Sequence, residues 1–176
     1  MQRVVFHRLD CLGSLWKREW GSEFYWEYPS KNLKKLPYPV LAVKELLDGN
    51  GFRKVGFASN FDPASKTAFE RIKPLVKLFR ASVHLVFVNT PAHFTNSIEV
   101  EERMNHFMKG FEELTFHKHV FNYSDPETGL EKFSDLHKIG LMALVSGHHE
   151  KIPNYQIGTT ETLVFQSDLA VLSIKL

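Results

Sequence analysis

The chain has 176 residues, of which 43% are hydrophobic and 24% are charged, and its formal net charge is +2 at pH 7. These values are typical of a folded domain with a full hydrophobic core, and the small net charge argues against a protein that binds nucleic acid or anionic membranes through its overall field. The single cysteine, Cys11, excludes an internal disulfide and a cysteine-based metal site, and no apolar run is long enough to cross a bilayer.

Residues 1–36 show neither a helical period nor a strand alternation. They contain all three tryptophans, Trp16, Trp20 and Trp26, among charged residues. Aromatic and basic residues in alternation can stack on nucleic acid, but we favour a role in covering a sheet edge or a subunit contact. Charged residues follow the first apolar ones directly, so there is no signal-peptide core. We expect a cytoplasmic protein with no nucleic-acid and no membrane partner.

A short β-type run, Val40–Val43, follows a Pro-Tyr-Pro segment and precedes the turn-rich residues 48–51. Proline and glycine clusters of this kind mark boundaries between elements. We therefore divide the chain into an N-terminal segment, 1–50, that ends in a strand at 40–43, and a domain that occupies residues 51–176.

From Lys54 onward, predicted strands and helices alternate. Buried strands are expected at residues 55–59, 83–88, 141–146 and 169–175, with a half-exposed edge strand at 115–123. Helices are expected to begin at Asp62-Pro63, Ser97, Asp125-Pro126 and about Thr159; Pro74 should kink the first, and Gly140 should end the third. This alternation predicts an α/β fold with three α/β/α layers around a five-stranded, parallel, doubly wound sheet.

Ligands of such sheets bind beyond the carboxyl ends of the strands, where the strand order reverses. In this chain that edge carries Ser59-Asn60-Phe61 after the first strand and Gly147-His148-His149 after the fourth. Gly158-Thr159-Thr160 precedes the last predicted helix, and free N–H groups at a helix start suit phosphate. The two threonines are equally suited to capping that helix, and Asp62 to capping the first one.

The sequence resembles the universal stress protein family at four places: residues 59–65, residues 83–88, Gly147-His148-His149-Glu150, and Gly158-Thr159 before a final helix and strand. The likeness covers roughly residues 52–176. It implies an adenine nucleotide alpha hydrolase-like sheet of order 3-2-1-4-5. It also implies a nucleotide site, for ATP or AMP with Mg²⁺, in which Asn60 and Phe61 flank the base and ribose. The site residues it implies are Ser59, Asn60, Phe61, Val88, Gly147, His148, His149, Gly158, Thr159 and Thr160.

Three positions depart from the pattern of ATP-binding members. Glu150 replaces the second glycine, only seven residues separate Glu150 from Gly158, and Asn60 replaces an aspartate. A glutamate adds bulk and a charge that repels phosphate, the shorter loop offers a smaller cradle, and asparagine donates as well as accepts hydrogen bonds. We expect a degenerate site that favours a smaller nucleotide, or none, over ATP.

Residues 39–44 resemble the last strand of a missing first domain in tandem members of the family. Such last strands pair with each other in the family. We therefore predict that Val40–Val43 pairs with the last strand, from Leu169 to Lys175, within one chain or across a homodimer, and thereby shields a hydrophobic edge.

The resemblance implies a stress-response protein that acts by binding and dimerisation rather than by turnover. One alternative is a small enzyme acting on a nucleotide or phosphoester at the same cleft, weak ATPase activity included; another is a structural dimerisation module. We assign no catalytic residues, because Ser146 lacks a Gly-x-Ser-x-Gly elbow. His117 and His119 share one strand face and could reach a metal, but no carboxylate stands at motif spacing, so we expect no metal site.

Overall fold

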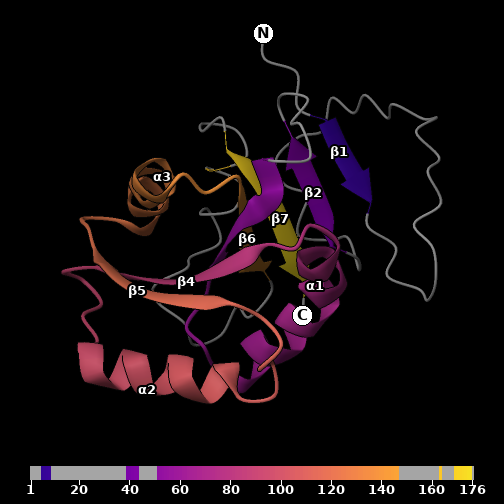
Figure 1. Cartoon of the computed structure of the whole chain (residues 1–176). Helices are drawn as coiled ribbons and strands as arrows, with labels where there is room; N and C mark the ends of the chain where they lie inside the picture. Colours follow the sequence, from indigo (N-terminus) through magenta and orange to yellow (C-terminus); the bar gives the residue numbers. More distant parts are fainter. Residues whose placement is uncertain (1–4, 9–38, 44–50, 147–162, 164–168, 176) are drawn as a thin grey trace, which may run out of the picture.

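The computed structural model describes residues 5–8, 39–43, 51–146, 163 and 169–175 (Figure 1). Within these residues, seven strands form one sheet in the order β1-β2-β7-β6-β3-β4-β5. Five of them pair in parallel, and their bounds are β3 (Lys54–Ala58), β4 (Ser82–Asn89), β5 (Phe116–Asn122), β6 (Leu141–Ser146) and β7 (Ala170–Lys175). The arrangement β5-β4-β3-β6-β7 is the predicted order 3-2-1-4-5, so the doubly wound sheet is confirmed.

Helices cover both faces of this sheet, because alternate strand residues point to opposite sides. The helices are α1 (Pro63–Leu78), α2 (Ser97–Met108) and α3 (Pro126–His137), and a short 3-10 helix, η2 (Gly51–Arg53), precedes β3. Phe57 and Leu85 share one core with α1 and α2. Val86 and Met142 share the other core with α3. Figure 1 shows α2 and α3 on opposite sides of β4 and β5, as the three-layer prediction requires.

The helix ends follow the sequence signals with small differences. Asp62 and Asp125 cap α1 and α3 as predicted, accepting backbone N–H groups at 2.7 and 2.8 Å. The cap of α2 is Asn96 and not Ser97, since the Asn96 side chain accepts the N–H of Ile98 at 2.9 Å. Lys138, in a left-handed conformation with φ of 54°, ends α3 where Gly140 was expected. The helix α1 runs through Pro74.

The N-terminal strands extend the sheet beyond β7. The strand β2 (Val40–Val43) pairs antiparallel with β7, with Val40 opposite Ser173 and Leu41 opposite Leu172. This confirms the predicted pairing in its intramolecular form. The strand β1 (Val5–Arg8), which the sequence pattern did not predict, pairs antiparallel with β2.

The structure forms the contact between β2 and β7 within one chain, and a homodimer through these strands stays a prediction. The strand β7 lies between β6 and β2, and β2 lies between β7 and β1. Residues 171–173 of β7 and residues 40–42 of β2 therefore have partners on both sides among the described residues. In the described part of the chain, no helix is both long enough and apolar enough to span a membrane.

Gly129 lets α3 approach the sheet closely. A Cβ atom at this position would lie 2.8 Å from Val88 Cγ1, closer than real Cβ contacts, and 3.0 Å from Tyr123 Cβ, tighter than most of them. Tyr123 Cβ is bonded to the backbone and Val88 has a β-branched, buried side chain, so neither atom can move far. The absence of a side chain at Gly129 thus sets the distance between α3 and β4.

We predict that Gly129→Ala destabilises the protein, although alanine favours helices by about 1 kcal/mol over glycine. Overpacking costs about 1–3 kcal/mol and outweighs that gain. The midpoint of urea denaturation should fall, whereas Lys132→Ala, on the exposed face of the same helix, should change stability by less than about 0.5 kcal/mol. A more stable Gly129→Ala protein would contradict the close packing of α3 on β4.

Candidate functional site

The turn from β3 into α1 is held by a chain of hydroxyl groups. The Ser59 hydroxyl accepts the N–H of Phe61 at 3.2 Å and makes a short hydrogen bond with the Ser65 hydroxyl. The Ser65 hydroxyl donates to Asp62 Oδ1 at 2.6 Å, so Ser59 is the donor to Ser65. Ser59 and Ser65 are both buried. The turn that follows β3 is therefore fixed by polar contacts before any ligand binds.

Phe61 adopts an unusual backbone conformation in this turn. Its φ is 57°, in the left-handed region that bulky residues rarely occupy. The ring is 4% exposed and packs against Phe57 and Phe107, with centroid distances of 6.3 and 5.4 Å. Core packing thus offsets the backbone strain, which costs about 1–3 kcal/mol at such positions. The ring belongs to the core and is not available to stack on a base, so only the backbone of Phe61 can line a ligand site.

Asn60, in the same turn, has a polar side-chain atom that packing does not satisfy. Its Oδ1 atom is buried and has no hydrogen-bond partner among the described residues. An unsatisfied buried acceptor costs about 1–3 kcal/mol, so such an atom in a native structure calls for an explanation. A ligand hydroxyl or amino group that donates to Oδ1 would remove this cost.

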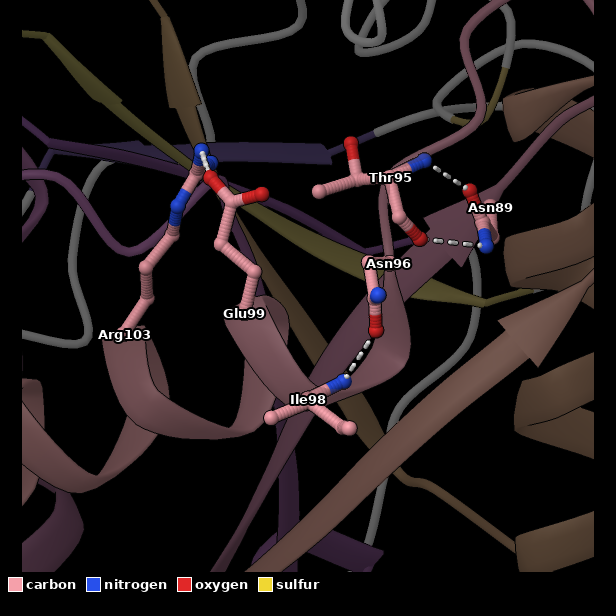
Figure 2. Close-up of polar contacts among 6 residues, drawn as sticks. All are labelled: Asn89, Thr95, Asn96, Ile98, Glu99 and Arg103. Carbon is pink, nitrogen blue, oxygen red and sulfur yellow. Dashed lines mark hydrogen bonds and ion pairs between the residues drawn. The ribbon is translucent and has the colours of Figure 1, made fainter.

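A second polar anchor lies at the carboxyl end of β4, where sequence reasoning placed only Val88. Asn89 is 4% exposed; its Nδ2 donates to the carbonyl of Thr95 at 3.0 Å, and its Oδ1 accepts the N–H of Thr95 at 2.9 Å. Figure 2 shows this pair beside the Asn96 cap of α2 and the ion pair between Glu99 and Arg103. The two bonds hold the loop between β4 and α2 in place. An asparagine at the end of an apolar strand was the available signal.

The comparisons with known proteins agree on one fold. No protein-family model and no curated protein matches the sequence. Among solved structures, a universal stress protein from Archaeoglobus fulgidus DSM 4304 has a TM-score of 0.62 and 20% identity, over 83% of this chain and 52% of that one. A putative universal stress protein from Pseudomonas aeruginosa UCBPP-PA14 has a TM-score of 0.56 and 17% identity, over 81% of this chain and 54% of that one.

A universal stress protein solved in complex with cAMP has a TM-score of 0.54 and 11% identity, over 70% of this chain and 97% of that one. The chain has the universal stress protein fold. It spans about half the length of the Archaeoglobus protein, with 52% of that chain covered.

In this universal stress protein fold, the strand register gathers part of the predicted site at one edge. Ala58 pairs with Val86 on one side and with Leu144 on the other. Two residues further along, Asn60, Val88 and the end of β6 therefore reach the same carboxyl edge. The Val88 side chain is fully buried under α3, so its backbone is what this edge presents.

The remaining predicted site residues lie outside the described residues, and their roles stay predictions. They are Gly147, His148, His149, Gly158, Thr159 and Thr160, together with Glu150.

We predict that Asn89→Asp destabilises the fold by about 1–3 kcal/mol, because a carboxylate accepts from the Thr95 N–H but cannot donate to the Thr95 carbonyl. The urea midpoint should fall near neutral pH. The control is Asn105→Asp, at an exposed position of α2 whose side chain accepts from Lys118 Nζ at 3.0 Å and keeps that role as a carboxylate. Equal stability of the two variants would show that the Asn89 contacts do not hold the loop.

Proposed function

We propose that this chain is a universal stress protein-like binding protein that takes an adenine nucleotide at the carboxyl edge of β3, β4 and β6 and acts in a stress response by regulation rather than by turnover. The observation that carries the proposal is the buried Oδ1 of Asn60, which has no partner among the described residues and lies at the strand-order reversal of the sheet. A neighbour of the same fold was solved with cAMP. A single cysteine suits a reducing compartment, so we propose a cytoplasmic role.

The nucleotide we favour carries a single phosphate, as AMP and cAMP do. Glu150 adds negative charge to the loop that would follow the phosphates, and the short spacing between Glu150 and Gly158 leaves less backbone to surround a triphosphate. Asn60 offers an acceptor to the ribose hydroxyls or to the adenine amino group, and these groups are common to all adenine nucleotides. A site that recognises the base and the ribose can therefore bind a nucleotide even when its loop is too short to surround a triphosphate.

Binding without turnover also fits the hydroxyl groups of this edge. The protons of Ser59 and Ser65 are directed along one chain that ends at Asp62, and Asp62 accepts the Ser65 N–H as the cap of α1. Both serines are buried, and Asp62 is held as the cap of α1, so the two hydroxyl groups are directed at the turn itself. These contacts support a role for the turn in holding its shape.

The test is nucleotide binding by the wild-type chain and two Asn60 variants, with AMP, cAMP, ADP and ATP, each with and without Mg²⁺. A ligand at a hundred times its dissociation constant stabilises the fold by about 2.7 kcal/mol, which a thermal-shift assay detects easily. We expect Asn60→Leu to weaken AMP or cAMP binding about tenfold, since it removes the acceptor. Asn60→Asp keeps an acceptor and should retain binding, as should the exposed control Asn105→Leu.

The unliganded variants supply a second readout. Replacing a buried, unpartnered polar group by an apolar one is neutral or stabilising, so Asn60→Leu should keep or raise the melting temperature without ligand. If Asn60→Leu binds the nucleotide more weakly but is as stable as the wild type without ligand, Asn60 contacts the ligand. The proposal is overturned if none of the nucleotides shifts the melting temperature. If the wild type releases phosphate from ATP and Asn60→Leu abolishes this release, the enzyme alternative is favoured.

A further inference from the structure

Four histidines meet at the amino-end half of the parallel sheet, away from the candidate nucleotide site. His84 is the third residue of β4, His117 and His119 lie on β5, and His137 is the last residue of α3. The β4–β5 register places His117 beside His84, and His119 follows on the same face of β5. His84 precedes Asn89 by five residues, which is about 16 Å along a strand. His84 thus lies near the amino end of β4, whereas His119, opposite Val86, lies at the middle of the strands.

Three of these side chains come within chelating reach of one another. The ligand nitrogens of His84, His119 and His137 all lie within 4.8 Å of each other. His84 Nδ1 and His119 Nε2 are 3.1 Å apart. Zinc–nitrogen bonds of about 2.0–2.1 Å at tetrahedral angles place two nitrogen ligands about 3.3 Å apart. The first pair is close to this separation, and the His137 nitrogen lies within 4.8 Å of both.

His84 is so deeply buried that an imidazole with a purely packing role would be unfavourable at this position. Its side chain is 7% exposed, and its Nε2 atom has no hydrogen-bond partner among the described residues. His119 and His137 do pack on Phe133, with ring centroids 5.0 and 4.4 Å away, so part of the cluster is ordinary core. A phenylalanine at position 84 would serve packing equally well without leaving a polar nitrogen unsatisfied. His84 also makes a hydrogen bond through Nδ1 to His119 Nε2, which a phenylalanine could not make, so packing alone does not explain an imidazole at this position.

The cluster can be reached from solvent. His119 and His137 are only half-buried, and β5 is the edge strand, which leaves a path for a metal from solvent.

We propose that His84, His119 and His137 form a binding site for one divalent transition metal ion such as Zn²⁺. A set of three imidazoles suits Zn²⁺, Cu²⁺, Ni²⁺ or Co²⁺, whereas Mg²⁺ and Ca²⁺ require oxygen ligands. The site joins β4, β5 and the end of α3, so a bound metal stabilises the contact of α3 with the sheet edge. It revises our expectation from the sequence that the chain has no metal site, and it does not depend on nucleotide binding.

Lys54 carries a positive charge near the proposed metal site and should weaken metal binding. Its ammonium donates a hydrogen bond to the His137 carbonyl at 3.0 Å. A positive charge this close repels a dication as well as a proton. Lys54→Met should therefore tighten metal binding, which a site elsewhere in the chain would not show.

The experiment titrates Zn²⁺ into the full, tag-free chain after treatment with a chelator, by calorimetry and by competition with a chromophoric chelator. We expect one equivalent to bind and to raise the melting temperature. Co²⁺ should bind at the same site and give the visible absorption of a low-coordinate cobalt centre.

The variants His119→Gln and His137→Gln should each weaken Zn²⁺ binding by at least about tenfold, since even changes next to metal ligands cost 10–100-fold. Both positions are half-buried, so the variants should fold, and a circular dichroism spectrum checks this without metal. The matched controls are His117→Gln, beside His84 but outside the ligand set, and the double change His148→Gln with His149→Gln; both should bind as the wild type does. No saturable binding at one equivalent, or binding that survives His119→Gln and His137→Gln, would overturn the proposal.

Discussion

The parallel pairing of β3 with both β4 and β6 is the constraint on which the rest of the molecule depends. From β3 the chain adds β4 and then β5 on one side of β3. It then crosses over and adds β6 and β7 on the other side. This reversal of strand order opens the carboxyl edge where Asn60 and Asn89 lie. The same register places His84 beside β5 at the other end of the strands. Both candidate sites are therefore consequences of one sheet.

Both sites also contain a buried polar atom that the described residues leave without a partner, namely Asn60 Oδ1 and His84 Nε2. The surrounding strands supply two apolar cores that include Phe57, Leu85, Met142 and Leu144. Burial of this apolar area stabilises the fold enough to tolerate a few unsatisfied groups. Asn60 follows the carboxyl end of β3 and His84 is near the amino end of β4, so the two proposed sites share no residue.

Local signals predicted the elements that form within 51–146 well. The caps Asp62 and Asp125 with their following prolines, the apolar strands and the half-exposed edge strand all depend on short-range sequence patterns. The pattern placed the cap of α2 one residue late, because Asn96 and Ser97 are both good capping residues and only the hydrogen bond to Ile98 distinguishes them. The strand β1 was missed because four residues that pair only with β2 carry little local signal.

The sequence by itself determined the alternation of strands and helices, and it marked Ser59-Asn60-Phe61 as a turn after the first strand of the domain, because periodicity and capping depend on near neighbours. Only the tertiary structure decided what each side chain does there. It turns the Phe61 ring into the core, leaves the Asn60 oxygen without a partner among the described residues, and uses β2 to cover β7 within one chain. His117 and His119 stood out as a pair in the sequence, but His84 and His137 join them only through strand register and the return of α3. Those contacts link residues far apart in the chain, and no local pattern encodes them.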